Sequence, residues 1–415
     1  MLHEHTAVPI AQAFCGAHPM TNELLSLARL FAKLSLTSFG GPAAHTAMME
    51  DEIVVRRRWL SRQSFLDLVG AANLIPGPNS TEVVMHIGHL RARWPGLVVA
   101  GTSFILPASL ITGVIAWFYV RYGALPQIES LLTGIRPVVI AIIAGAIWRL
   151  GRQAAKNWQL VAIGLAVAAA ALLGFSEVLA MFLGGLMGMI WLRGRAGLAD
   201  RRGLVSAVLL ALALIAGVTA ILTLGVNASQ LWADSARAQE GRPPLGLLGM
   251  YFLFIGSVLY GTGYVLFAFL EGGLVNTFGW LTEQQLIDAI AVGQLTPGPL
   301  FSSATFIGYV IAGWPGAVVA TVGIFLPSFV FVAALTPLIP KMRRSAWMAA
   351  FLDAINVSAI GLMVIVCLQL GRTTLVSWQA WLLLAVALIL GLRWKVNSAF
   401  LIAGGAIAGW LMAQI

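Results

Sequence analysis

Two short stretches of this sequence combine a helix-breaking motif with hydroxyl and amide side chains. Each contains Pro-Gly-Pro, at residues 76–78 and again at residues 297–299. Proline lacks an N–H donor and clashes with the preceding turn, so neither motif can lie inside an intact helix. A helix that starts directly after such a motif presents unpaired N–H groups and the positive end of its dipole. This arrangement suits a tetrahedral oxyanion, which accepts hydrogen bonds on every oxygen.

A glycine-rich break precedes each motif, at residues 39–42 (Phe-Gly-Gly-Pro) and at residues 260–263 (Tyr-Gly-Thr-Gly). Glycine lets the backbone approach an ion closely. The alternative, that these residues only kink helices for packing, is disfavoured because the pattern occurs twice with hydroxyl-rich flanks. The candidate anion-binding residues are Phe39, Gly40, Gly41, Pro76, Gly77, Pro78, Asn79, Ser80, Thr81, Gly261, Thr262, Gly263, Thr296, Pro297, Gly298, Pro299, Ser302 and Ser303.

Glu82 lies one turn after Pro78 in an otherwise apolar segment. A carboxylate is expensive to bury in a membrane, so such a residue is a functional candidate by default. We therefore consider Glu82 as the carrier of a coupling proton. The alternative is a charge that the helix N-terminus simply stabilises. Ser303 stands at the equivalent place in the second copy, so the two copies differ chemically here.

The composition is that of a polytopic all-helical membrane protein. Of 415 residues, 59% are hydrophobic and 10% are charged, whereas soluble domains carry about a quarter charged residues. The net charge of +9 lies in short loops, which fits the basic cytoplasmic loops of membrane proteins better than nucleic-acid binding. The sequence has no Walker A loop, His-Glu-x-x-His helix, Gly-x-Ser-x-Gly elbow or Cys-x-x-Cys pair. We therefore predict no metal, no cofactor and no enzymatic activity.

The second half of the chain repeats the order of the first. The two Pro-Gly-Pro motifs are separated by 221 residues, and Trp94-Pro95-Gly96 recurs as Trp314-Pro315-Gly316 at a separation of 220. A nearly constant offset between separate motifs indicates a duplication. We divide the chain into a tail (1–22), a first repeat (23–202), a linker with an unpaired transmembrane helix at 204–226 (203–243) and a second repeat (244–415).

Basic residues occupy complementary loops in the two repeats. Arg56, Arg57, Arg58, Arg91 and Arg93 have no basic counterparts in the second copy. This pattern predicts oppositely inserted repeats, a cytoplasmic N-terminus and an external C-terminus. Arginines on both sides of the first Pro-Gly-Pro motif favour a re-entrant hairpin there, and the alternative counts each such segment as a full crossing. Arg136 either faces a cavity or extends to the membrane surface.

The motifs at 39–42, 74–81, 94–96 and 293–301 together resemble the chromate ion transporter family in its long, two-domain form. The resemblance implies a bacterial inner-membrane protein that exports chromate, confers chromate resistance and uses the membrane potential or the proton gradient. From the repeat we expect the anion to bind between the two Pro-Gly-Pro motifs, with access alternating as one half rocks against the other.

Other functions remain open at this point. Sulfate is a tetrahedral dianion of similar size, so a sulfate or other oxyanion carrier is the first alternative. A membrane-embedded enzyme that uses Glu82 or the histidines is disfavoured because the sequence shows no nucleophile–base pair. A passive anion channel is a further alternative. The expected partners are chromate or sulfate and the lipid bilayer, and the sequence leaves open whether the protein forms a homodimer.

Overall fold

The computed structural model describes residues 20–39, 42–123, 125–193, 243–260, 263–336 and 346–414. These residues form helices and loops without any strand. The tail up to residue 19, the span expected at 204–226, and the candidate residues Gly40, Gly41, Gly261 and Thr262 lie outside the described residues. The helices of the first repeat are α1 (Met20–Thr37), α2 (Pro42–Glu50), η2 (Asp51–Arg56), α3 (Arg62–Ala72), α4 (Asn79–Tyr122), α5 (Pro126–Ala154), α6 (Trp158–Leu172) and α7 (Glu177–Arg193).

The second repeat follows the same order of elements. It contains α9 (Leu245–Val258), η3 (Gly263–Val265), α10 (Leu266–Leu270), η4 (Glu271–Thr277), α11 (Glu283–Leu295), η5 (Leu300–Ser302), α12 (Ser303–Leu335), α14 (Ala346–Thr374), α15 (Trp378–Arg393) and α16 (Ser398–Met412). The long helices α4 and α12 correspond, as do α5 and α14. In the described residues, Asn79–Tyr122, Ile128–Ala154, Leu300–Ala334 and Ala346–Thr374 are long and apolar enough to span a membrane. The protein is a multi-pass membrane protein.

Helices α4 and α12 each fold back on themselves near their N-termini. The backbone leaves helical geometry at Ala92 and Arg93 in α4, and at the equivalent Ala312 and Gly313 in α12. A Cβ built on Gly88 would lie 2.3 Å from the carbonyl oxygen of Gly96. Eight residues of straight helix would span about 12 Å, so the two arms must pack side by side. Each Pro-Gly-Pro motif therefore precedes a short helical arm that reverses direction.

The lengths of these segments bear on how the Pro-Gly-Pro motif sits in the bilayer. Helix α3 has 11 residues and is about 17 Å long at the usual rise per residue. A membrane core of about 30 Å needs roughly 20 residues. Helix α3 and the first arm of α4 are each too short for a crossing, which favours the re-entrant arrangement over two full spans.

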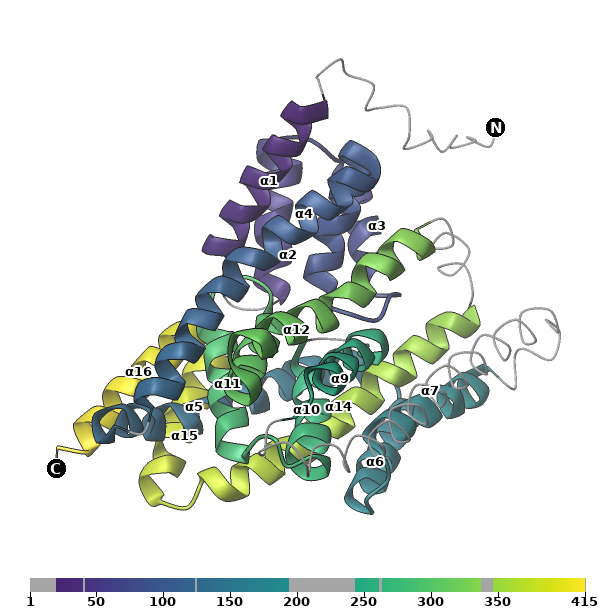
Figure 1. Cartoon of the computed structure of the whole chain (residues 1–415). Helices are drawn as coiled ribbons and strands as arrows, with labels where there is room; N and C mark the ends of the chain where they lie inside the picture. Colours follow the sequence, from purple (N-terminus) through teal and green to yellow (C-terminus); the bar gives the residue numbers. More distant parts are fainter. Residues whose placement is uncertain are drawn as a thin grey trace.

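The two repeats exchange helices. Helix α5 of the first repeat packs against α15 and α16 of the second, and α14 packs against α6 and α7 (Figure 1). The remaining helices form a separate group in which α1 packs on α4, α9 packs on α12, and α4 packs on α12. We call α1–α4 with α9–α12 the motif unit, and α5–α7 with α14–α16 the scaffold unit.

Equivalent helices of the two repeats run in opposite directions. At the end of α5, Lys156 forms an ion pair with Asp353, near the start of α14, with an N–O distance of 2.7 Å. At the opposite ends of the same helices, Arg136 of α5 and Thr373 of α14 line one cavity. An antiparallel relation between equivalent helices is the arrangement that an inverted duplication produces.

Glycines allow α5 and α16 to pack with their backbones in contact. A Cβ on Gly409 would lie 2.4 Å from the Ser130 carbonyl oxygen, and one on Gly134 would lie 2.1 Å from the Gly405 carbonyl oxygen. Small residues that permit such approach are the usual basis of helix association in membranes, where lipid tails are as apolar as leucine. This contact joins the first repeat to the last helix of the second.

We expect Gly409→Val to lower the melting temperature of the detergent-purified protein. The added side chain meets backbone on α5, and overpacking of this kind typically costs about 1–3 kcal/mol. The control is Gly404→Val on the same helix, where a Cβ would have nothing within 4 Å. Equal melting temperatures for the two variants would show that this helix contact does not limit stability.

Candidate functional site

Both Pro-Gly-Pro motifs lie in breaks between helices. Residues 76–78 separate α3 from α4, and residues 297–299 separate α11 from η5. The central glycines adopt positive φ angles, +138° at Gly77 and +98° at Gly298, a conformation that L side chains rarely adopt. The glycine in each motif is thus required by the backbone conformation as well as by its surroundings.

Each Pro-Gly-Pro motif is hydrogen-bonded to the glycine-rich break of the other repeat. The Gly77 N–H donates to the Leu259 carbonyl oxygen at 2.8 Å, and the Gly298 N–H donates to the Ser38 carbonyl oxygen at 3.0 Å. Ser38 directly precedes the break at 39–42, and Leu259 directly precedes the break at 260–263. The four motifs therefore meet as two equivalent pairs, each built from both repeats.

The first pair forms what we call the Gly77 cluster, which consists of Gly77, Glu82, Leu259, Tyr260 and Ser328. A Cβ built on Gly77 would lie 2.4 Å from Glu82 Oε1 and 2.4 Å from Ser328 Oγ. Both of these side chains are fully buried, and Tyr260, which directly follows Leu259, is buried as well. The Ser328 hydroxyl faces the carboxylate in a geometry short of a hydrogen bond. A carboxyl group and a hydroxyl therefore converge on one glycine.

The second pair forms the Gly298 cluster, which consists of Gly298, Ser35, Ser38 and Ala108. A Cβ built on Gly298 would lie 3.0 Å from Ser35 Oγ and 2.7 Å from the Ala108 Cβ. Ala108 occupies the position that corresponds to Ser328 in the duplication. Ser303 stands at the position of Glu82, so this cluster has no carboxyl group there, and the two clusters share a backbone conformation but differ in chemistry.

Several buried polar atoms around the two clusters have no hydrogen-bond partner within the described part of the chain. They belong to Ser35, Thr81, Glu82, Ser109, Gln294, Ser303 and Ser328. Each of these side chains is at most 7% exposed. Buried polar groups in folded proteins are nearly always paired, and leaving them unpaired is costly. A concentration of unpaired hydroxyls at the two helix breaks is what a site for a polar ligand requires.

Some of the residues predicted from sequence are engaged locally. The Thr296 hydroxyl donates to the Val292 carbonyl of its own helix, and Ser302 Oγ accepts a bond of 3.3 Å from Thr112. Ser80 contacts His45 at 3.3 Å, Gly263 packs on Leu300, and Phe39 is 40% exposed. Of the predicted side chains, Thr81, Glu82 and Ser303 are fully buried and have no hydrogen-bond partner among the residues that the structure describes.

Three of the serines in this region did not figure among the sequence candidates. Ser35 lies in α1, Ser109 in the second arm of α4, and Ser328 in the second arm of α12. The only signal in the sequence is a small polar residue inside an apolar run. Such residues are common in membrane helices, where they also serve helix packing, so the signal alone was too weak to identify them.

Asn79 points toward a different space. Its amide donates to the Asn73 side chain at 2.6 Å, and both residues line a cavity of about 270 Å³ together with Lys156, Asp353 and Asn356. This cavity lies between the motif unit and the scaffold unit. It offers amide groups and one ion pair at the start of α4.

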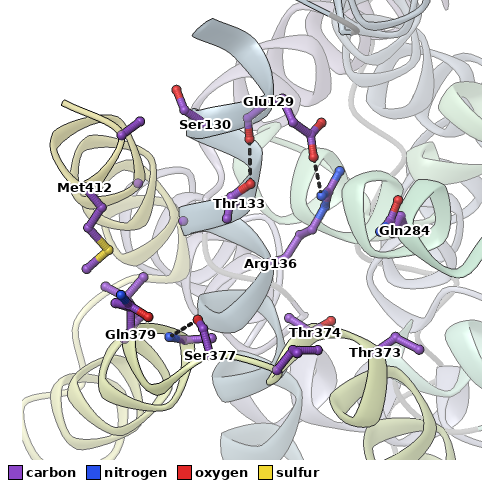
Figure 2. A pocket seen from close by; sticks show the side chains of 16 residues that line it. Glu129, Ser130, Thr133, Arg136, Gln284, Thr373, Thr374, Ser377, Gln379 and Met412 are labelled. Carbon is purple, nitrogen blue, oxygen red and sulfur yellow. Dashed lines mark hydrogen bonds and ion pairs between the residues drawn. The ribbon is translucent and has the colours of Figure 1, made fainter. Parts of the chain in front are cut away.

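A second cavity, of about 610 Å³, lies at the opposite ends of α5 and α14 (Figure 2). Its lining includes Arg136 and Thr373, whose equivalents in the duplication, Asn356 and Gln153, line the smaller cavity. The two cavities therefore occupy equivalent places in the inverted repeats. The smaller cavity is lined by both units, and the larger one is lined by the scaffold unit together with Gln284 of the motif unit.

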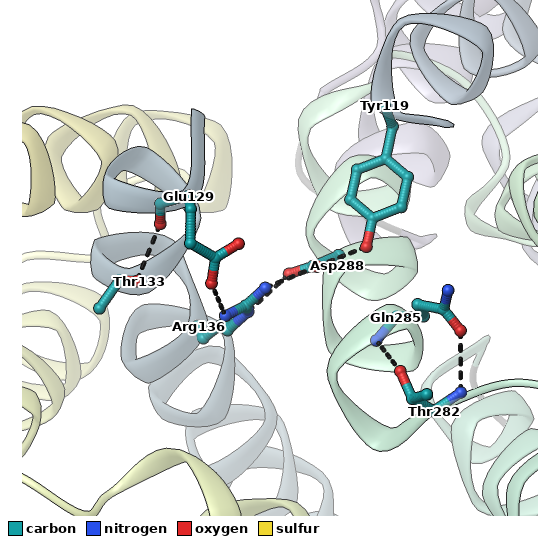
Figure 3. Close-up of polar contacts among 7 residues, drawn as sticks. All are labelled: Tyr119, Glu129, Thr133, Arg136, Thr282, Gln285 and Asp288. Carbon is teal, nitrogen blue, oxygen red and sulfur yellow. Dashed lines mark hydrogen bonds and ion pairs between the residues drawn. The ribbon is translucent and has the colours of Figure 1, made fainter. Parts of the chain in front are cut away.

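A buried ion pair lies beside the larger cavity, which Arg136 and Glu129 also line (Figure 3). Arg136 donates to both carboxylate oxygens of Asp288 at 3.0 Å, and Tyr119 donates to the same carboxylate at 2.9 Å. Glu129 accepts a further bond of 2.7 Å from Arg136. Arg136 thus faces inward and is paired, rather than extending to the membrane surface. Because Asp288 lies in α11 and Arg136 in α5, the pair joins the two units.

Within the described residues, no group of three or more His, Cys, Asp or Glu side chains could hold a metal ion. The polar groups that converge on the Pro-Gly-Pro motifs are hydroxyls, amides, backbone N–H groups and a single carboxyl group. They suit an oxyanion better than a cation, except for Glu82 in its ionised form.

Comparisons with known proteins identify the family of the chain. The family model described as "Chromate transporter" matches residues 25–189 and residues 247–410. A chromate transport protein of Cupriavidus metallidurans is 31% identical over 392 residues, which cover 94% of this chain and 93% of that protein. A probable chromate transport protein of Synechococcus elongatus is 30% identical over 397 residues, covering 94% and 96%. No solved structure matches the chain. The chain belongs to the chromate transporter family.

Proposed function

We propose that the protein is a secondary transporter that carries chromate out of the cytoplasm and thereby gives chromate resistance. The observation that carries this proposal is the set of buried, unpartnered hydroxyl groups around Gly77 and Gly298. The anion binds between the two clusters, where hydroxyls and backbone N–H groups at the helix breaks replace its hydration shell. Membership of the family supports chromate as the transported anion.

The exchange of helices changes the motion expected from sequence. One half of the chain cannot rock as a rigid body against the other, because α5 is held by α15 and α16, and α14 is held by α6 and α7. We propose that the motif unit moves against the scaffold unit instead. The two polar cavities at this boundary would then open in turn to the two sides of the membrane.

The test is chromate uptake into everted membrane vesicles, with and without an uncoupler and with and without excess sulfate. Uptake that saturates, requires the gradient and is only partly inhibited by sulfate is the expected result. Uptake abolished by modest sulfate would identify sulfate as the main substrate. Flux that neither saturates nor depends on the gradient would indicate a channel, and no uptake would contradict the proposal.

We expect Ser328→Ala and Ser35→Ala each to weaken apparent chromate affinity by about tenfold or more. A hydrogen bond to a charged group contributes about 1.5–3 kcal/mol, and 1.4 kcal/mol corresponds to a factor of ten. The control is Ser257→Ala in α9, because the Ser257 hydroxyl donates to the Leu253 carbonyl of its own helix. Unchanged affinity in both cluster variants, at normal membrane levels, would exclude these hydroxyls from the anion site.

The same assay applies to Asn79→Ala and Ser302→Ala, for which we expect weaker transport without loss of membrane expression. Asn79 lines the smaller cavity and Ser302 lies in the first turn after the second Pro-Gly-Pro motif. Normal flux in both variants would restrict the site to the hydroxyls that have no partner among the described residues.

A further inference from the structure

We infer that the anion and a proton bind together in the Gly77 cluster, so that each transported dianion travels with one proton carried by Glu82. This inference rests on the proposed function, because it names a second species that the same site transports. It also fixes the direction of coupling: the proton moves with the anion and is not exchanged for it.

The position of Glu82 is the first observation. Its side chain is fully buried in the first turn of α4, beside Gly77 and Ser328, and neither carboxylate oxygen has a hydrogen-bond partner within the described residues. It forms no ion pair with any described residue. A charge buried in this way without a partner is strongly unfavourable, whereas the protonated acid is a neutral group with an O–H to donate.

The helices packed around α4 bring no free cation to Glu82. Tyr260, which follows Leu259 at the cluster, is buried and carries no positive charge, and His45 of α2 is bonded to Ser80 and to the Ser38 carbonyl oxygen. The nearby His86 lies one turn further along α4. Among the charged groups of the neighbouring helices, ion pairs join Glu23 to Arg91, Lys33 to Glu52, Arg62 to Glu50 and Asp288 to Arg136, and Asp67 of α3 is bonded to Gln63. Arg29 of α1 is exposed and Glu283 of α11 is a carboxylate, so neither is a buried cation beside Glu82.

The second observation comes from the duplication. Ser303 occupies the position equivalent to Glu82, and it too is fully buried with no partner within the described residues. A serine hydroxyl is always able to donate a hydrogen bond, but a carboxyl group donates only when protonated. If this position must offer an O–H to the anion in both repeats, Glu82 must carry a proton whenever the anion is bound.

Electrostatics gives the same result. An ionised Glu82 and a chromate dianion in one desolvated cluster repel each other, and no described cation lies between them. Protonation removes the repulsion and supplies a donor. Since Ser303 cannot ionise in this way, only one of the two clusters takes up a proton. The complex of dianion and proton carries one net negative charge, which an inside-negative membrane potential drives outward.

The experiment measures reversal potentials in liposomes that contain the purified full-length protein. Chromate flux is followed while potassium diffusion potentials and pH gradients are imposed separately. For the wild type we expect the potential of zero flux to shift by about 59 mV per pH unit of gradient, the value for one charge per tenfold change in concentration. A wild-type reversal potential that does not respond to the pH gradient would overturn the inference while leaving chromate transport intact.

The Glu82→Gln variant separates this mechanism from transport of the hydrogen chromate ion, which would also carry one proton. Glutamine imitates the protonated acid, so we expect the potential of zero flux in this variant not to shift with the pH gradient. For this variant, a membrane potential of about 30 mV should stop the net flux driven by a tenfold chromate gradient, because two charges move with each anion. If the variant keeps the pH-dependent shift of the wild type, the proton does not travel on Glu82. Glu177→Gln, a carboxylate at the start of α7, is the matched control and should behave as the wild type.

Chromate binding to the detergent-purified protein provides a second measurement if Glu82→Gln does not support flux. We expect the affinity of the wild type to fall by up to tenfold per unit of rising pH, relative to the Glu82→Gln variant at the same pH. Because both proteins meet the same mixture of chromate and hydrogen chromate, the ratio reports on Glu82 alone. A ratio that does not change with pH would overturn the inference. Absence of both binding and flux in the wild type would instead overturn the proposed function.

Discussion

Gly77→Ala is expected to reduce chromate flux in everted vesicles at least tenfold at normal membrane levels of the protein. The φ angle of +138° at this position is unfavourable for any residue with a Cβ, and strain of this kind costs about 1–3 kcal/mol. The added methyl group would also lie 2.4 Å from both Glu82 Oε1 and Ser328 Oγ. It would therefore displace the two side chains that we propose contact the anion.

The matched control for this variant is Gly313→Ala. Gly313 also has a positive φ angle, +64°, but a Cβ there would have nothing within 4 Å. Its counterpart in the first repeat is Arg93, whose φ angle is +53°, so the fold already accepts a side chain at the equivalent turn. Normal flux in Gly77→Ala would show that the anion site does not need a glycine at this position. An equal loss in Gly313→Ala would show that the loss comes from backbone strain and not from contact with the anion site.

Asp288→Asn should destabilise the protein by about 3–5 kcal/mol, the usual cost of removing one partner from a buried ion pair. The Asp288 side chain is fully buried and Arg136 is 12% exposed, so the guanidinium would lose its bidentate partner and keep only Glu129. The measurement is the free energy of unfolding of the detergent-purified protein, together with its melting temperature.

A second ion pair in the same protein offers the control. Lys156 and Asp353 are 58% and 34% exposed, and pairs in such settings contribute about 0–1 kcal/mol. Asp353→Asn should therefore have little effect. Replacing both members of the buried pair, as Arg136→Met with Asp288→Leu, should restore part of the loss, because no unpaired charge remains. Similar losses in Asp288→Asn and Asp353→Asn would refute the assigned difference in burial.

Much of the architecture could be predicted from the sequence because repeated motifs at a nearly constant separation reveal the duplication. The offset of 220 to 221 residues recurs as matched helix breaks and as kinks at Ala92 and Ala312. The expectation of oppositely inserted repeats agrees with the antiparallel course of α5 and α14. The positions of the termini relative to the membrane and the domain boundaries stay predictions.

The parts that could not be predicted depend on packing between segments far apart in the chain. Arg136 and Asp288 are 152 residues apart, and the local sequence around either residue does not predict the other as its partner. The orientation of Ser35, Ser109 and Ser328 likewise depends on which face of each helix meets a neighbour. In apolar helices that contact lipid as well as protein, hydrophobic periodicity does not reveal that face.

The exchange of helices between the repeats also has a consequence for synthesis. Domains generally fold from the N-terminus as the chain emerges, yet α5 obtains its principal partners only when α15 and α16 have been made. The backbone contact between Gly134 and Gly409 closes last of all, because α16 is the final helix of the described chain. During synthesis, the surface of α5 that contacts α15 and α16 therefore remains without these partners in the bilayer. A ribosome that stops before α15 would leave a product that is inserted but unable to complete its core.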